Sequence, residues 1–109
     1  MTETSSILPG TLDMLVLKVL SLEPMHGWGI GERIQQCSRE VFLVNQGTLY
    51  PTLERLQQRG WIINDWRITE NNRRARYYTL TPLGATQLRE ARRSWSRASG
   101  AVNWILQTR

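Results

Sequence analysis

The sequence contains very few residues that could hold a metal ion or form a covalent intermediate. Its 109 residues include a single cysteine, Cys37, and a single histidine, His26. These two residues cannot form an intrachain disulfide, a multi-cysteine zinc site, or a cysteine–histidine nucleophile with a third orienting partner. The carboxylates are scattered, and no nucleophile is paired with a base. We therefore expect no enzyme, no metal and no cofactor, and a reducing compartment.

Long hydrophobic stretches are also missing. No apolar run approaches the roughly 20 residues that span a bilayer, and the first residues lack the basic region and apolar core of a signal peptide. With 40% apolar and 21% charged residues, the composition is that of an ordinary globular chain. A chain of this length builds one core, and self-association would add to its stability. We expect a folded cytoplasmic protein with no membrane partner, and a homodimer.

Lysine is nearly absent, yet the chain is basic. Lysine and arginine together number 14, against nine acidic residues, and Lys18 is the one lysine. Eight arginines and two glutamates lie within residues 67–97, whereas residues 1–66 carry five cations and seven anions. Guanidinium groups bind phosphate bidentately, and a basic half beside a mildly acidic half is expected of a nucleic-acid-binding protein.

Helical patterns dominate the first half of the chain. A short arm that ends at Pro9-Gly10 precedes a helix predicted over 12–22, with Thr11 as its N-cap. The apolar residues of this helix, which include Leu12 and Leu15, cover two of its sides. We expect one side to pack against its own domain and the other to pack against a partner subunit.

The next segment, HGWGIG at residues 26–31, superficially resembles a phosphate-binding loop. No strand precedes it and no Gly-Lys-Ser/Thr follows it, so we reject that interpretation. Its glycines instead let a second helix, over 27–38, approach the first one closely. His26 then lies in a turn or at the helix N-terminus, and the packing residues are Trp28, Ile30 and Ile34.

A third helix is predicted over 46–59, capped by Asn45 and preceded by a brief strand at 41–44. Pro51 is tolerated only near a helix start, so either the helix begins near Thr48 or it is kinked. The side of this helix opposite its leucines carries Gly47, Thr48, Pro51, Arg55 and Gln58, with Tyr50 at the border.

Strand patterns and a long helix follow. Strands over 61–68 and 76–80 flank the polar turn at 69–75, which predicts a hairpin with a basic tip. Thr81-Pro82 supplies an N-cap and a proline at the first helical position, so the last helix should run over 82–107, weakened at Gly100. Apolar residues along it follow the heptad spacing of a dimer seam: Leu88, Ala91, Trp95, Ala98, Val102 and Ile105.

This order of elements is that of a winged helix-turn-helix. The predicted fold class is mainly α with a small β-hairpin: residues 1–81 form a winged-helix DNA-binding domain with its short N-terminal arm, and residues 82–109 form a C-terminal dimerisation helix. A helix of about 14 residues with a polar outer face fits the major groove, and an arginine hairpin beside it can reach phosphates. A dimer would place two such helices on successive half-sites of double-stranded DNA.

Three separated segments resemble the PadR family of bacterial transcriptional regulators: HGWGIGERI, NQGTLYPTLERLQQRGWI and RRARYYTLTPLG. The family carries HGYGI, EGTLYPAL-type and RKYYxLTxxG motifs in the same order, and the resemblance spans about residues 8–107. The last helix is similar to that of small members with one C-terminal helix. Two positions depart from the family pattern, because Asn45-Gln46 stands where Ser-Glu is common and Trp28 replaces a common tyrosine.

The resemblance implies a homodimeric repressor that binds an inverted-repeat operator and is released by a small, often aromatic, ligand. By position it implies DNA contacts at the start of the third helix and in the wing. Together with the polar face of that helix, the predicted DNA-binding residues are Thr48, Tyr50, Pro51, Arg55, Arg73, Arg74 and Arg76.

Each of these roles has an alternative. Tyr50 either contacts DNA or covers the edge of the core. The wing arginines either contact phosphates or remain solvated. Arg55 either contacts DNA or belongs to the solvent-exposed face of its helix. A winged helix can also serve as a protein–protein interaction module without sequence-specific DNA binding, although such a module has less need of an arginine-rich wing.

The last helix raises a ligand hypothesis. Trp95 lies at an a position between Ala91 and Ala98, so a pair of indoles facing each other across the dimer could leave space for a flat aromatic molecule. The alternative is that Trp95 only fills the interface. The residues predicted to form the dimer interface are Leu12, Leu15, Leu88, Trp95, Val102 and Ile105.

Overall fold

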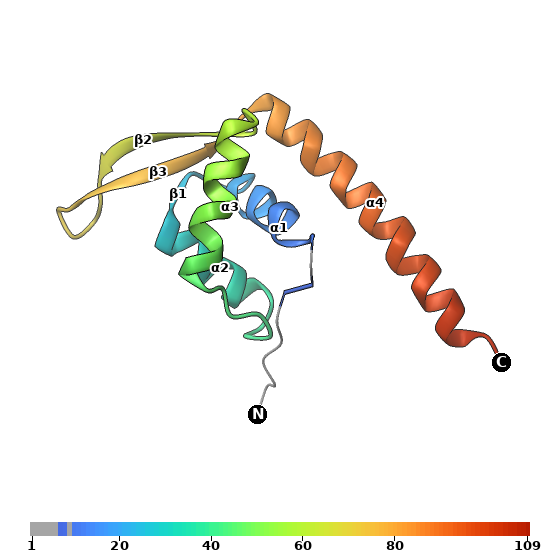
Figure 1. The fold of residues 1–109 in the computed structure, drawn as a ribbon. Coiled ribbons are helices and arrows are strands. Elements are labelled where there is room, and N and C mark those ends of the chain that lie inside the picture. The colour runs from blue at the N-terminus through green and yellow to red at the C-terminus, as the bar shows by residue number, and fades with distance from the viewer. Residues whose placement is uncertain (1–6, 9) are drawn as a thin grey trace.

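The computed structural model describes residues 7, 8 and 10–109, so most of the predicted N-terminal arm, including Pro9, lies outside the described residues. Three helices and a three-stranded antiparallel sheet form a winged helix-turn-helix, and a long last helix leaves it at one corner (Figure 1). The predicted fold class is confirmed. The molecule measures 58 × 36 × 22 Å, and its longest dimension reflects the projecting helix.

Helix α1, Leu12–Leu20, is two residues shorter than predicted. At its C-terminal end the Ser21 N–H donates to the Leu17 and Lys18 carbonyls, and the Ser21 hydroxyl donates to the Lys18 carbonyl at 2.5 Å. At the other end, the Thr11 hydroxyl donates to the Leu8 carbonyl at 2.7 Å and accepts nothing from the helix. Thr11 therefore occupies the N-cap position as predicted, but its side chain does not cap the helix.

Helix α2, Gly27–Cys37, begins where the sequence predicts. His26 is its N-cap, because Nδ1 of the imidazole accepts a hydrogen bond from the Gly29 N–H at 3.1 Å. Ile30 and Ile34 are buried as predicted, but Trp28 is 58% exposed. The packing role assigned to Trp28 is therefore wrong. Trp28 and Ile30 are two residues apart, and this separation places their side chains on opposite faces of the helix.

The strand predicted at 41–44 is also wrong. Phe42 forms only an isolated bridge, and the third strand of the sheet is β1, Met25–His26, which pairs with the wing. Arg39 and Glu40 adopt positive φ angles of 55° and 67°, so the chain turns sharply after α2. The apolar residues that follow this turn pack on the core from a loop.

Helix α3, Gln46–Gln58, closely matches the third predicted helix. Oδ1 of Asn45 accepts a hydrogen bond from the Gly47 N–H at 2.7 Å, which confirms the predicted cap. The helix begins at Gln46 rather than near Thr48, so Pro51 lies inside it, in the second turn. Proline has no N–H, and the Gly47 carbonyl therefore has no backbone donor four residues later.

The wing is the hairpin of β2, Ile62–Ile68, and β3, Arg74–Leu80. β3 begins two residues earlier than predicted because Thr69 closes the tip, its N–H donating to the Arg73 carbonyl at 2.7 Å and its hydroxyl accepting from the Arg73 N–H at 3.2 Å. The strand order is β1-β3-β2. The hairpin extends well beyond the helices (Figure 1).

Helix α4, Pro82–Gln107, starts at the base of the wing, where the Thr81 hydroxyl accepts from the Gly84 N–H at 3.0 Å. Gly84 lies directly on the Trp61 carbonyl oxygen, and any Cβ there would collide with it. The first half of α4 packs against α1, so part of the surface predicted to meet a partner is covered within the chain.

No helix in the described part of the chain combines the length and hydrophobicity that crossing a bilayer requires.

The core lies between α1, α2 and α3 and is closed by the sheet and by the first half of α4. This packing fixes the orientation of α3 and the wing relative to each other. The buried apolar residues are Val16, Leu17, Val19, Leu20, Met25, Ile30, Ile34, Leu49, Leu53, Leu56, Ile62, Tyr78 and Leu88.

Candidate nucleic-acid interface

One side of α3 remains outside the core. Leu49, Leu53 and Leu56 recur at helical spacing and are fully buried, which turns the opposite side toward solvent. At 1.5 Å per residue the 13-residue helix is about 20 Å long, and a helix of this width fits a major groove about 12 Å across. The exposed residues of this outer face are Gly47, Thr48, Tyr50, Pro51, Glu54 and Gln58.

Tyr50 lies at the border between α3, α2 and the wing. One edge of its ring packs so closely on the backbone of Gly27 that a Cβ at Gly27 would lie 2.7 Å from the Tyr50 hydroxyl oxygen. The side chain is nevertheless 48% exposed. Tyr50 and Arg76 both line a hollow of about 320 Å³ between the start of α2 and the wing. Tyr50 thus covers an edge of the domain with its hydroxyl end, while about half of the residue stays exposed beside the outer face of α3.

Charged and polar side chains around this hollow affect the pKa of the buried Tyr78. Burial raises the pKa of Tyr78, the nearby Tyr50 hydroxyl raises it further, and the Arg76 guanidinium opposes both effects. Glu54 of α3 adds a smaller upward effect on the pKa of Tyr78. Tyr50 of α3 and Arg76 and Tyr78 of β3 line the same hollow, so the start of α3 adjoins the wing there.

The wing presents its arginines with aromatic neighbours. Arg73 is exposed at the tip, while Arg74 and Arg76 project from β3. Both guanidinium groups lie over the Trp66 ring, with their central carbons 4.8 and 5.1 Å from its centroid. Trp66 was not among the predicted site residues. The available signal was the hairpin register, which places Trp66 opposite Arg76.

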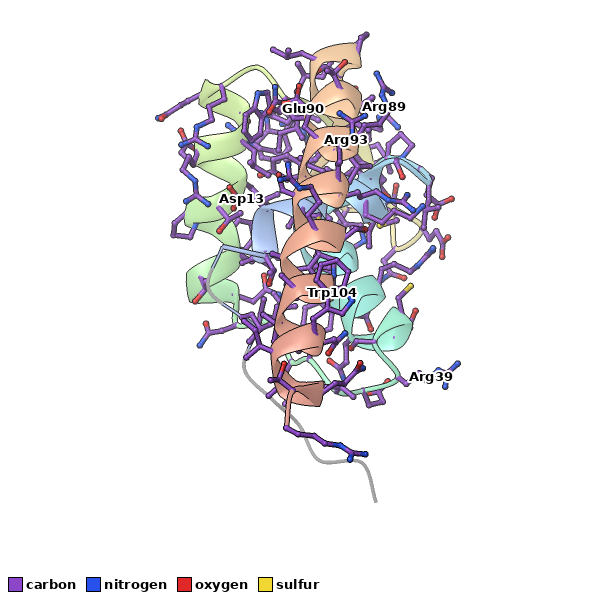
Figure 2. All side chains as sticks on the ribbon, turned by 90° about the vertical axis from the view of Figure 1, so that its right-hand side faces the viewer. Asp13, Arg39, Arg89, Glu90, Arg93 and Trp104 are labelled. Carbon is purple, nitrogen blue, oxygen red and sulfur yellow. The ribbon has the colours of Figure 1, made fainter. Side chains whose placement is uncertain are left out.

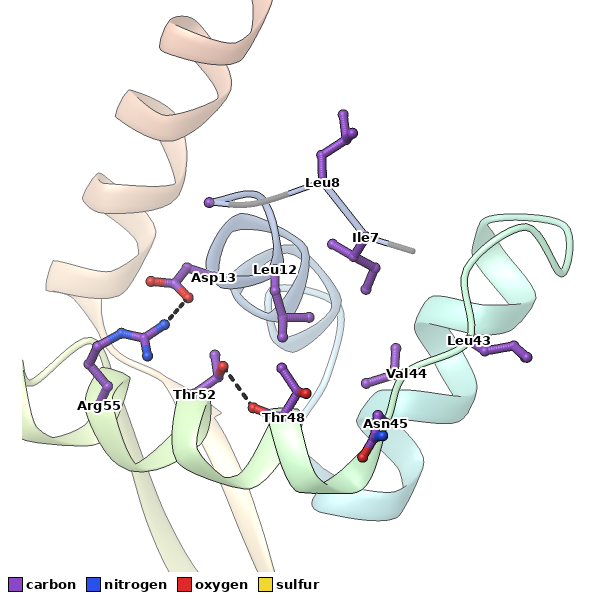
Figure 3. A pocket seen from close by; sticks show the side chains of 11 residues that line it. Ile7, Leu8, Leu12, Asp13, Leu43, Val44, Asn45, Thr48, Thr52 and Arg55 are labelled. Carbon is purple, nitrogen blue, oxygen red and sulfur yellow. Dashed lines mark hydrogen bonds and ion pairs between the residues drawn. The ribbon is translucent and has the colours of Figure 1, made fainter. Parts of the chain in front are cut away.

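Arg55, and Thr48 at the border of the outer face, lie on the side of α3 nearer to α1. The Arg55 guanidinium forms an ion pair with Asp13, and the Thr52 hydroxyl donates to the Thr48 carbonyl at 3.0 Å (Figure 3). A pocket of about 490 Å³ lies there, with apolar walls from α1 and from the loop before α3. Arg55 is therefore held at the edge of the outer face rather than at its centre.

The second half of α4 is apolar and exposed. Every residue from 101 to 109 is exposed, and Trp104, Ile105 and Leu106 are 73%, 71% and 75% accessible. Figure 2 looks onto α4, with Arg89, Glu90 and Arg93 on its first half and Trp104 on its second. Leu88, the first residue of the predicted seam, is instead buried in the core of its own chain.

The three residues of the ligand hypothesis lie together. Ala91, Trp95 and Ala98 line a groove of about 350 Å³ between α4 and the start of α1, where Met14 and Thr11 form the other wall.

The predicted residues therefore occupy three places: the outer face of α3 with the wing, the Arg55 pocket, and the α4 surface. Within the described residues, no group of three or more His, Cys, Asp or Glu side chains is arranged to hold a metal ion.

Comparison with known proteins agrees with this architecture. Residues 16–90 match the transcriptional regulator PadR-like family. The chain is 42% identical to the transcriptional regulator Rv3488 of Mycobacterium tuberculosis over 60 residues, which are 55% of each protein. A PadR-like transcriptional regulator from Bacillus cereus superposes with a TM-score of 0.81 at 28% identity, over 94% of this chain and 97% of that one.

A PadR family transcriptional regulator from Eggerthella lenta superposes with a TM-score of 0.79 at 30% identity, over 92% of this chain and 85% of that one. The family match extends from the middle of α1 into α4 and includes both α3 and the wing. The chain therefore belongs to the PadR-like family of transcriptional regulators, and it is a DNA-binding protein rather than an enzyme.

Proposed function

We propose that this regulator is a homodimeric repressor that binds an inverted-repeat operator in cytoplasmic double-stranded DNA and is released by a small aromatic ligand. The observation that carries the proposal is the exposed apolar end of α4. Val102, Ile105 and Leu106 are more than half exposed on a helix that projects from a well-packed domain. Exposed apolar surface on this scale favours association with a second apolar surface, and a second copy of the chain supplies one.

Association through α4 would leave α3 and the wing free in both copies. Two-fold symmetry then presents two recognition helices to one duplex, which requires an operator with two-fold sequence symmetry. In each half-site the start of α3, with Thr48, Tyr50 and Pro51, enters the major groove. Arg73, Arg74 and Arg76 of the wing contact phosphates, because guanidinium groups on an exposed hairpin match that charge and geometry.

Arg55 takes a supporting position in this arrangement. Its ion pair with Asp13 ties α3 to α1, and its side chain is still partly exposed at the edge of the outer face. It can therefore reach the DNA backbone only at the margin of the contact.

Selection of bound sequences from a random duplex pool tests the proposal, with the oligomeric state measured on the same sample. We expect a dimer and an enriched inverted repeat whose half-sites are about one helical turn apart. Binding by a monomer, or the absence of any enriched sequence, contradicts the proposal. Salt-insensitive behaviour toward DNA would point instead to a protein–protein interaction module.

The ligand part of the proposal rests on the groove beside Trp95. Flat aromatic molecules are expected to stack on this indole between Ala91 and Ala98, and to quench its fluorescence. Trp95→Ala should abolish both the binding and the quenching while the dimer stays intact. Unaltered ligand binding in this variant would restrict Trp95 to packing in the interface.

A further inference from the structure

The two faces of the wing differ in whether their arginines form ion pairs with carboxylates. Side chains alternate between the faces of a hairpin, so Trp66, Ile68, Arg74 and Arg76 share one face. Asn64 lies on this face as well, and its side-chain amide donates to Gln57 of α3. The face that carries Trp66 is therefore the one turned toward the recognition helix.

On the opposite face of the two strands, the arginine is already paired with a carboxylate. Arg67 pairs with Asp65 at 3.2 Å and lies over the Tyr77 ring, with 5.3 Å from its guanidinium carbon to the ring centroid. On the α3-facing side, by contrast, neither Arg74 nor Arg76 forms an ion pair within the described residues. Both lie on the ring of Trp66, a residue that is itself 53% exposed.

A ring beneath a guanidinium group orients it without consuming its charge. A carboxylate partner would neutralise an arginine and compete with phosphate, whereas an aromatic face attracts the cation and leaves its N–H donors at the edge free. An arginine ordered before binding also loses less rotamer freedom when it meets its partner. Trp66 meets these conditions for two arginines at once.

We propose that Trp66 is a positioning residue for DNA binding, which holds Arg74 and Arg76 ready for phosphates on the α3-facing side of the wing. The inference rests on the proposed function only in assigning that side to DNA. Trp66 acts through the two arginines and makes no essential contact with DNA itself.

A mutant cycle on one fixed duplex of mixed sequence tests this inference, with affinity measured over a range of salt concentrations. The variants are Trp66→Ala, Trp66→Phe, the pair Arg74→Ala with Arg76→Ala, and the triple variant. We expect Trp66→Ala to weaken binding about tenfold and Trp66→Phe to restore most of the affinity, because phenylalanine keeps a ring. In the background without the two arginines, Trp66→Ala should have almost no effect.

Ile63→Ala is the matched control, because Ile63 is an exposed apolar residue on the opposite face of the same strand. It should leave affinity unchanged, and thermal melting should show that every variant folds. A second readout is magnetic resonance of the arginine side chains. The Nε–H signals of Arg74 and Arg76 should be shifted by the indole ring current in the free protein and in the complex, and should lose this shift in Trp66→Ala.

The outcomes separate the two proposals. If removal of both arginines weakens binding and lowers the salt dependence while Trp66→Ala does neither, the positioning role is wrong and the wing contact stands. If Trp66→Ala costs the same affinity with and without the arginines, Trp66 contacts DNA directly and the positioning role is again wrong. If removal of the arginines changes nothing, both the wing contact and this inference are wrong.

Discussion

The winged domain and the second half of α4 are stabilised in different ways. In the domain, thirteen apolar residues are buried by contacts within one chain. From residue 101 onward no residue is buried, although Val102, Trp104, Ile105 and Leu106 are as apolar as the core. A short helix in water gains most of its stability from packing on one face. One chain therefore completes the domain, whereas the end of α4 keeps an apolar surface that its own chain does not cover.

Two glycines on α4 give the largest contrast between these regions. Gly84 touches the Trp61 carbonyl oxygen, whereas a Cβ at Gly100 meets nothing within 4 Å. We expect Gly84→Ala to lower the free energy of unfolding by about 3 kcal/mol, because backbone must move to admit the methyl group. Gly100→Ala should raise helix stability by about 1 kcal/mol. Urea denaturation measures both, and equal effects at the two positions would mean that the joint at Gly84 is not tight.

The exposed end of α4 can be tested by introducing charge. In Val102→Glu with Ile105→Glu, the buried dimer seam would have to hold four carboxylates, so we expect a monomer by sedimentation. Loss of one of two linked contacts should reduce operator affinity about 100-fold or more. The winged domain should still melt cooperatively, since these residues lie outside its core.

Ser96→Glu is the matched control for this experiment. Ser96 is exposed on the same helix, but on the side opposite the seam. It should leave the assembly and its affinity unchanged. A double variant that remains dimeric would show that α4 associates through another face.

Features formed by neighbouring residues could be predicted from the sequence, whereas features formed by long-range contacts could not. Helix boundaries marked by strong local chemistry, such as Asn45 before α3 and Thr81-Pro82 before α4, were predictable because the cap is made by the residue itself. The strand β1 was not, because two residues carry no periodicity and their pairing with Tyr77 and Tyr78 is a long-range contact.

Within the candidate site, the sequence could identify the arginines but not their surroundings. Trp66 and Trp28 looked like strand and core residues, and only the hairpin register and the orientation of α2 bring them to the surface. Arg55 was predictable as polar, but its pairing with Asp13 joins positions 42 residues apart. Such pairings depend on how the helices pack, which local sequence patterns do not encode.

A smaller effect is expected at the start of α2, where the winged domain depends on one side-chain cap. His26→Ala removes the acceptor for the Gly29 N–H and should lower the free energy of unfolding by about 1 kcal/mol. His26→Asn should recover most of this loss, because asparagine is a strong N-cap. Thermal melting of the two variants makes the comparison, and equal losses would assign the stability to the edge-to-face contact of His26 with Tyr77 instead.

The smallest effect concerns Tyr78, where burial raises the pKa above its ordinary value of 10.0. A raised pKa means that the folded state holds the phenolic proton more tightly than the unfolded state does. The resulting stabilisation is fully present below pH 10 and is lost as the pH rises through the raised pKa. Tyr78→Phe should therefore make the alkaline decline in unfolding free energy shallower, whereas the control Tyr77→Phe should not. An identical alkaline decline in wild type and Tyr78→Phe would mean that the Tyr78 hydroxyl is accessible to water, and that the junction between α3 and the wing is looser than its packing implies.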